Sequence, residues 1–161
     1  MDESAGKPEI HRGLKGVYFD RSRVCYIDGR AGELRYRGYA IHDLAQQSNF
    51  EETCYLLLKG ALPTRTELER FDAELKAART LPGPIYDIIG AVKRARPMDE
   101  LRTCVSALSA FDPETADKSP PATVRKGIRL TAQVPMIVAG HSHMRYGPEP
   151  VPLLRFYEDY Y

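Results

Sequence analysis

The sequence predicts a mainly α-helical domain that begins with one short β-hairpin. Hydrophobic residues make up 43% of the 161 residues and charged residues 28%, which are the proportions of a soluble globular chain. Downstream of residue 38, apolar side chains recur at the three- and four-residue spacing of helices that bury one face. Apolar and polar residues alternate only before that point, so the strands are expected there.

The hairpin is expected before Gly38, which should end it because glycine interrupts a strand pattern. Val24–Ile27 is β-branched and aromatic, and residues 33–37 alternate between apolar and polar side chains. Residues 28–32 between them contain aspartate and glycine, which favour a turn. A single helical turn is expected to follow at residues 41–45.

Two capping boxes predict where the next two helices begin. Ser48 and Glu51 have the required spacing, and the apolar residues after them share one face until Gly60 supplies a stop. Thr64 and Glu67 open the second helix in the same way. The buried face of this second helix is expected to consist of Leu68, Phe71 and Leu75.

Prolines mark the remaining helices. Residues 81–84, which contain two prolines and a glycine, are expected to separate the preceding helix from a short amphipathic helix over residues 85–92. Pro97 is expected to start the next helix. A polar connection leads to the last helix, expected near residues 123–146, where Pro135 should introduce a kink because it lacks an N–H. The apolar stripe of the helix at Pro97 consists of Met98, Leu101, Cys104, Val105, Leu108 and Phe111.

The composition argues against several classes of protein. The net charge is +1, from 23 basic and 22 acidic side chains, so we expect no nucleic acid and no membrane as partner. The longest nearly apolar run, residues 134–140, is far shorter than the roughly 20 residues that span a bilayer. The acidic start of the chain lacks a signal-peptide pattern. The three cysteines form no CxxC pair, so we expect a cytoplasmic protein with reduced thiols.

No local motif assigns a reaction. The sequence has no glycine-rich phosphate loop and no GxSxG motif, so we assign no catalytic residue, no cofactor-binding residue and no cofactor. His141 and His143 cluster, but side chains two residues apart on a helix diverge by about 200°. We expect them on the surface or in an interface at a helix end, and we assign no metal ligand; metal binding by this pair is the alternative. His11 and His42 are isolated.

Longer patterns carry a resemblance to a known family. Residues 27–45, IDGRAGELRYRGYAIHDLA, and residues 48–64, SNFEETCYLLLKGALPT, strongly resemble the citrate synthase family. Its members typically show Asp-Gly, then Leu-x-Tyr-Arg-Gly-Tyr-x-Ile, then Phe-Glu-Glu-x-x-Tyr-Leu-Leu and Gly-x-Leu-Pro. Residues 96–103 are similar to the family's His-Pro-Met-x-x-Leu-Arg-Thr, with Arg96 in place of the histidine.

The resemblance spans about residues 13–150 in order. Residues 13–17 look like the family's opening Gly-Leu-x-Gly-Val, and residues 134–139 and 145–150 resemble a kinked helix that comes later. The most similar members look like the bacterial and archaeal short form, including 2-methylcitrate synthases. The division implied is an N-terminal arm at 1–15, a partial helical domain at 16–150 and a divergent tail at 151–161.

The resemblance implies a fold, a partner and a chemistry. The family's large domain is mainly α-helical and forms homodimers through antiparallel helices, among which the helices near Met98–Phe111 and Val124–Tyr146 would fall. Its members condense an acyl-CoA with oxaloacetate. An aspartate removes a proton from the thioester methyl group, histidines stabilise the enol and polarise the ketone, and arginines hold the carboxylates.

The family motifs that carry this chemistry do not occur in the sequence. His-Ala-Asp-His-Glu, Gly-x-x-His-Gly and Gly-His-Arg-Val-Tyr belong to the C-terminal half of the family. We therefore expect a truncated, N-terminal part of a citrate synthase-like acyltransferase of the tricarboxylic acid cycle, inactive alone. The alternative is a non-catalytic homodimerising or regulatory module that associates with a full-length synthase. Acetyl-CoA and propionyl-CoA are both open as the substrate of a complete member.

Overall fold

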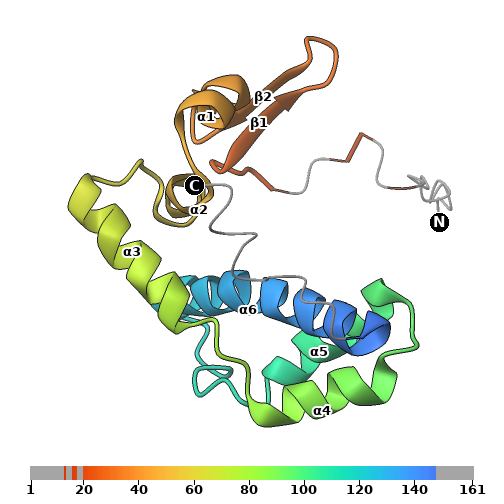
Figure 1. Ribbon diagram of the computed structural model, residues 1–161. Coiled ribbons are helices and arrows are strands. Elements are labelled where there is room, and N and C mark those ends of the chain that lie inside the picture. The colour runs from red at the N-terminus through yellow and green to blue at the C-terminus, as the bar shows by residue number, and fades with distance from the viewer. Residues whose placement is uncertain (1–12, 14–15, 18–19, 148–161) are drawn as a thin grey trace, which may run out of the picture.

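A computed structural model describes residues 13, 16–17 and 20–147 of the chain. Within them, a three-stranded antiparallel sheet and a short helix are followed by five further helices (Figure 1). The expected fold class, mainly α with an N-terminal hairpin, is confirmed. The tail expected at 151–161 and, apart from Gly13, the arm expected at 1–15 lie outside the described residues.

The sheet contains the expected hairpin and one more strand. Strands β1 (Cys25–Asp28) and β2 (Glu33–Tyr36) pair antiparallel, and β3 (Tyr39–Ala40) pairs with β2 on the other side. As expected, β2 ends before Gly38, because Arg37 (φ 50°) and Gly38 (φ 97°) form a tight turn with both residues in the left-handed region; the sequence did not predict that the chain returns to the sheet as β3. A strand of two residues is too short to produce a periodic signal.

The first two helices meet at Ser48, which closes one helix instead of opening the next. Helix α1 (Ile41–Gln47) ends where the Ser48 amide donates to the carbonyl of Leu44 over 3.0 Å. Helix α2 (Phe50–Lys59) is therefore capped one residue later than expected. The side chain of Asn49 accepts from the amide of Glu52 at 2.8 Å, and the Glu52 carboxylate accepts from the amide of Asn49 at 3.2 Å.

The C-terminal end of α2 holds the sheet in place. Gly60 ends the helix with φ 95°, as expected. The guanidinium of Arg37 donates from Nη2 to the carbonyl of Leu57 over 3.0 Å. That carbonyl lies in the last turn of α2, where carbonyls lack helical partners and favour a cation. The β2–β3 turn is thus hydrogen-bonded to the end of α2.

Helices α3 and α5 begin where they were expected, and α4 begins two residues before the expected Ile85. Helix α3 (Arg65–Ala77) has the Thr64–Glu67 capping box, in which the Thr64 amide donates to the Glu67 carboxylate over 2.8 Å. Phe71 and Leu75 are buried on it, and Leu68 is only half-buried. Helices α4 (Gly83–Val92) and α5 (Pro97–Leu108) both carry proline in the first turn. Because α5 ends at Leu108, Phe111 lies beyond the helix and is exposed.

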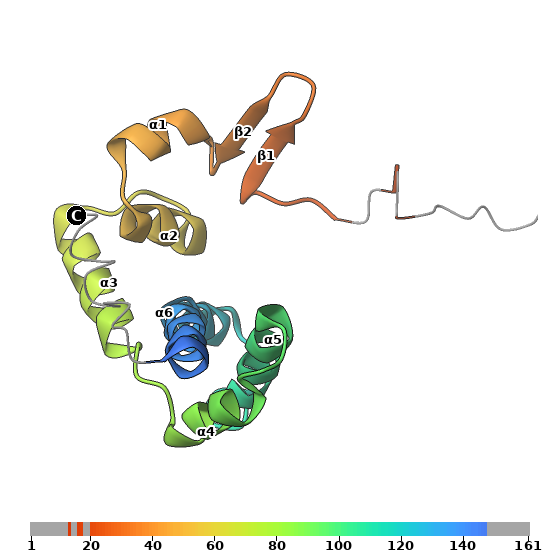
Figure 2. The same cartoon turned by 45° about the vertical axis from the view of Figure 1, so that its right-hand side comes forward.

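Helix α6 (Pro120–Tyr146) is the longest of the described helices, with 27 residues. It begins before the expected Thr123, because Ser119 caps it and proline is well accommodated in a first helical turn. It continues through Pro135. Figure 2, which looks nearly along α6, shows it surrounded by α3, α4 and α5. No helix of the described residues, α6 included, is long and apolar enough to cross a membrane.

Two apolar clusters hold these helices, and α6 contributes to both. Toward its N-terminal half, Ile128 and Ala132 pack with Phe71 and Leu75 of α3, and the ring of Tyr55 meets that of Phe71 edge-on at 5.3 Å. Toward its C-terminal half, Ile137 packs with residues of α4 and α5 and of the segment before α4. This second cluster consists of Leu81, Ile85, Ile89, Cys104, Leu108 and Ile137.

The corrected cap of α2 leads to a test. We expect Asn49→Ala to lower the free energy of unfolding by about 1 kcal/mol, because it removes the acceptor of the Glu52 amide. Ser48→Ala is the matched control and should cost less than about 0.5 kcal/mol, since its hydroxyl makes only long contacts at 3.3 and 3.4 Å. Urea unfolding measures both variants. Equal losses would show that the cap has been assigned to the wrong residue.

Candidate functional site

A small pocket lies between the end of α5, the following loop and α6. Its volume is about 200 Å³, below the range of roughly 300–1,000 Å³ typical of small-molecule sites. The walls are mostly apolar. Phe111 and Leu130, which line the pocket, are both partly exposed to solvent. The polar residues that line the pocket are Ser109, Asp112, Thr115, Lys126, Arg129 and Gln133.

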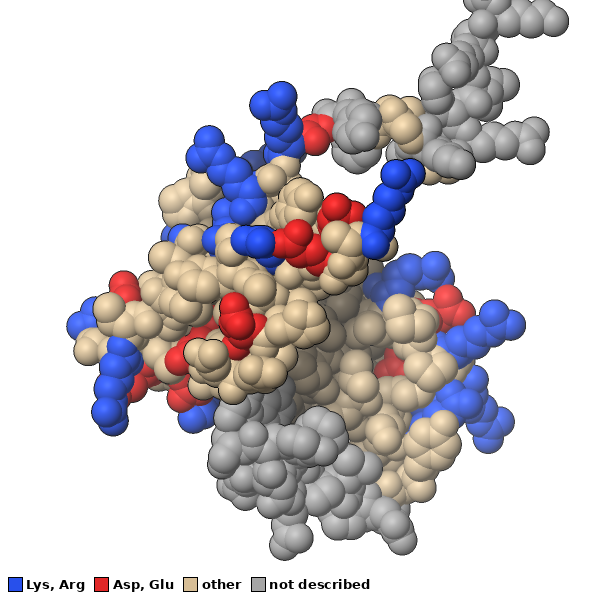
Figure 3. All heavy atoms as spheres, turned by 90° about the horizontal axis from the view of Figure 1, so that it is seen from above, with Lys and Arg blue, Asp and Glu red and all other residues tan. Residues whose placement is uncertain are grey.

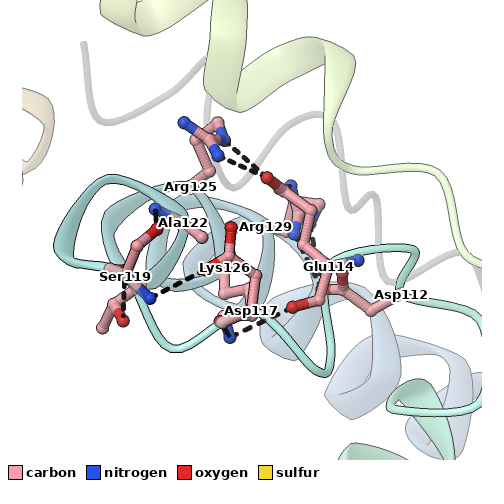
Figure 4. A network of polar contacts seen from close by, with 9 residues as sticks. Asp112, Glu114, Asp117, Ser119, Ala122, Arg125, Lys126 and Arg129 are labelled. Atoms are coloured by element: carbon pink, nitrogen blue, oxygen red, sulfur yellow. Dashed lines mark hydrogen bonds and ion pairs between the residues drawn. The ribbon is translucent and has the colours of Figure 1, made fainter.

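A network of ion pairs borders this pocket and ties the α5–α6 loop to α6 (Figure 4). The guanidinium of Arg129 donates to both carboxylate oxygens of Asp112, with Nη2–Oδ1 at 2.8 Å and Nε–Oδ2 at 3.1 Å. It also reaches Oε2 of Glu114 at 2.8 Å. Arg125 donates from Nε to the other oxygen of Glu114 at 2.9 Å, and the ammonium of Lys126 donates to the Glu114 carbonyl at 3.2 Å.

These contacts change the acidity of the two carboxyl groups. Hydrogen bonds from Arg125 and then Arg129 lower the pKa of Glu114 to about 2. For Asp112, burial acts to raise the pKa, but hydrogen bonds from the Glu114 amide and from Arg129 lower it overall. Both groups are therefore ionised at neutral pH and neutralise the cations beside the pocket. The guanidinium groups at this pocket already have carboxylate partners, which makes the network a structural clamp on the loop.

The described histidines differ in exposure. His42 on α1 is exposed. On α6, His141 is buried, and His143, two residues further along the helix, is exposed. The expectation that His141 and His143 point apart on a helix is confirmed, and the described residues contain no group of three potential metal ligands. The expectation that His141 lies at the surface or in an interface is wrong. His11 lies outside the described residues.

His141 is buried because its partner, Glu100, is buried opposite it. Nδ1 of His141 contacts Oε2 of Glu100, and this contact joins α6 to α5. Sequence reasoning missed the pair, although a signal existed. Glu100 precedes the buried Cys104 by one helical repeat of four residues, and His141 follows the buried Ile137 by the same interval.

The three cysteines form no disulfide. Cys25 is exposed on β1, Cys54 is half-buried on α2 and Cys104 is buried on α5. Burial raises the pKa of Cys54 and of Cys104, so both thiols are protonated at neutral pH and are weak nucleophiles. On the face shown in Figure 3, basic and acidic side chains are interspersed.

The clamp on the α5–α6 loop can be tested with two arginines. We expect Arg129→Gln to lower the free energy of unfolding by about 1–2 kcal/mol, because a forked, largely covered guanidinium loses two carboxylate partners. Arg102→Gln is the control, since Arg102 pairs with Asp99 but its side chain is 79% exposed. That change should stay within about 0.5 kcal/mol. Chemical denaturation of both variants measures the difference, and indistinguishable midpoints would contradict a stabilising role for the clamp.

The sequence of this chain is similar to those of known proteins. The chain matches the family model described as "Citrate synthase, C-terminal domain" over residues 13–160. The citrate synthase of Haloferax volcanii is 42% identical over 149 residues, which cover 89% of this chain and 39% of that relative. The 2-methylcitrate synthase 1 of Corynebacterium glutamicum is 35% identical over 142 residues, covering 88% of this chain and 37% of that relative.

The fold agrees with these relatives. The crystal structure of citrate synthase from Pyrobaculum aerophilum is similar with a TM-score of 0.81 and 34% sequence identity, over 85% of this chain and 37% of that one. The chain spans about two-fifths of the length of the curated relatives that it matches. Since the family match covers nearly all of the sequence and the structure has the same fold, this chain belongs to the citrate synthase family.

Proposed function

We propose that this chain is the N-terminal helical part of a citrate synthase-like acyltransferase, which condenses acetyl-CoA or propionyl-CoA with oxaloacetate in the cytoplasm. The observation that carries the proposal is the continuous family match over residues 13–160, together with the shared fold. Residues 16–150 supply the scaffold. The free state of all three cysteines supports a reducing compartment.

We also propose that the 161 residues do not catalyse the condensation by themselves. Removing a proton from a thioester methyl group needs a base and hydrogen-bond donors to the enolate within reach of one substrate. Among the described residues, His42 is exposed on α1, whereas His141 is buried against Glu100. The pocket beside α6 is small for an acyl-CoA, and the guanidinium of Arg129 is neutralised there. Two larger hollows beside α1, of about 580 and 480 Å³, have no histidine, lysine or arginine among their lining residues.

Thiol release tests this proposal. We expect the purified 161-residue chain to release no coenzyme A from acetyl-CoA or propionyl-CoA in the presence of oxaloacetate. We expect activity to appear when the chain is mixed with the C-terminal portion of a relative such as the Haloferax volcanii citrate synthase. Each portion alone is the control. Turnover by the lone chain, abolished by His42→Ala, would contradict the proposal that its catalytic groups lie elsewhere.

A second candidate function is a non-catalytic module that dimerises or associates with a full-length synthase. It is favoured by exposed apolar side chains on the two helices expected at the interface. Met98 on α5 is 72% exposed, and Val138 on α6 is 52% exposed. The rest of the α5 stripe packs inward, because Cys104 and Leu108 are buried in the cluster with α4. An interface would therefore use the outer faces of the two helices.

Light scattering after size-exclusion chromatography tests the homodimer. We expect a dimer for the wild-type chain and a monomer for Val138→Glu and Met98→Glu, because a charge in an apolar contact is poorly solvated. Leu62→Glu is the control, since Leu62 is an exposed apolar residue between α2 and α3, away from these helices. A wild-type monomer that also fails to bind a full-length synthase would eliminate the module.

A further inference from the structure

Glu100 and His141 are two ionisable groups buried between α5 and α6. Their side chains are 1% and 8% exposed, and Oε2 of Glu100 contacts Nδ1 of His141. Within the described residues no hydrogen bond is made by either oxygen of Glu100 or by either ring nitrogen of His141. Each group therefore has one polar contact, and that contact is with the other group.

The pair occupies core positions at the place where α5 begins and α6 nears its end. Glu100 lies in the first turn of α5, and His141 lies in the last two turns of α6. Helix α4 covers the same region closely, since a Cβ on Gly140 would lie 3.2 Å from Cδ1 of Ile89. The pair thus joins α5 to α6, and α4 packs on α6 at the residue next to His141.

The helix ends and the surrounding charges act on the pair in different ways. The positive N-terminal end of α5 stabilises a carboxylate at Glu100. Burial lowers the pKa of His141, and the charge of Arg145, one turn further along α6, adds to the effect. Arg145 also ties this end of α6 to the α4–α5 connection by donating to the carbonyl of Ala95 over 2.8 Å. The carboxylate of Glu100 acts in the opposite direction, by attracting a proton to the imidazole.

Cys104, one turn beyond Glu100 on α5, is buried, and burial raises the pKa of its thiol, which is therefore uncharged at neutral pH. The other charged or titratable groups of the three helices at this end are exposed. On α4 and before α5, these are Tyr86, Asp87, Lys93, Arg94 and Arg96; on α5, Asp99 and Arg102; on α6, His143, Arg145 and Tyr146. Their charges are therefore screened by water. Ile89 and Gly90, the α4 residues that approach Gly140 and Met144 of α6, do not titrate.

Counting hydrogen-bond donors shows what acid does to this contact. A neutral imidazole with its hydrogen on Nδ1 has one donor, and that donor faces the Oε2 atom of Glu100 that the ring contacts. An imidazolium has two donors, and the second, on Nε2, is buried with no acceptor among the described residues. An unpaired buried donor is costly, so a second hydrogen on the ring destabilises the packed state.

We propose that Glu100 and His141 form a pH-sensitive latch, which holds the start of α5 against the end of α6 while the imidazole is neutral and weakens when it is protonated. The latch is a property of the α4–α5–α6 packing and does not depend on synthase activity. His141 binds its proton less readily in the folded chain than in the unfolded chain. Its contribution to the free energy of unfolding is therefore fully present above the pKa that His141 has in the unfolded chain. This contribution is lost as the pH falls from there toward the pKa of His141 in the folded chain.

Nitrogen NMR of the imidazole rings in the complete 161-residue chain tests the protonation state directly. We expect the His141 ring at pH 7 to be neutral with hydrogen on Nδ1. Its titration midpoint should lie below that of the same ring in the chain unfolded by urea. Glu100→Gln should lower the midpoint further, because it removes the carboxylate that attracts the proton. An imidazolium at pH 7, or a midpoint unchanged by unfolding, would overturn the proposal.

Thermal unfolding between pH 7.5 and 5.5 tests the consequence for stability. We expect the Tm to fall as the pH is lowered through this window. The size of the fall depends on the difference between the unfolded and folded pKa values of His141, at about 3–5 °C for each unit of that difference. The variant His141→Asn keeps a donor toward Glu100 but cannot titrate at this position, so its Tm should not change with pH in this window. His143→Asn, which changes an exposed histidine of the same helix, should behave like wild type. A His141→Asn variant whose Tm falls in parallel with wild type would disprove the latch. If that variant does not fold, the ring titration decides.

Discussion

The burial of α6 between two apolar clusters is the constraint on which the rest of the structure depends. Its N-terminal half packs on α3 through Ile128 and Ala132, and its C-terminal half packs on α4 and α5 through Ile137. Each fully buried aliphatic side chain contributes roughly 1.5–3 kcal/mol, more than a single cap or exposed ion pair. Because one helix serves both clusters, the α2–α3 part and the α4–α5 part are fixed relative to each other.

Signals that act within a few residues could be predicted from the sequence. The Thr64–Glu67 capping box, the stop at Gly60 and the proline that opens α5 depend on local backbone hydrogen bonding, and the structure has them as expected. The cap of α2 could not be placed correctly in the same way. Ser48 and Asn49 are both good capping residues, and the choice between them depends on where α1 ends.

What the sequence could not supply is the pairing of groups far apart along the chain. In the sequence, nothing distinguishes Arg129 and Asp112 from ordinary surface charges. They pair only because the α5–α6 loop folds back on α6, where the guanidinium donates to the carboxylate. Glu100 and His141 are separated by the whole of that loop and meet only because two helices cross there. Periodicity places both on buried stripes, but a charged residue at such a position is usually assigned to the surface. The error over His141 comes from this preference, which holds only for groups without a buried partner.

Polar interactions at the two ends of α6 therefore play different roles from the apolar clusters. Near the start of the helix, the carboxylates of Asp112 and Glu114 have lowered pKa values, so acid weakens that clamp only well below neutral pH. Near its end, the buried imidazole of His141 responds to milder acid, because the ordinary pKa of histidine lies above that of a carboxyl group and protonation adds a donor with no acceptor among the described residues. The cluster around Ile128 contains only apolar buried residues. Mild acid should consequently loosen α6 from its C-terminal end first, while its N-terminal half stays packed on α3.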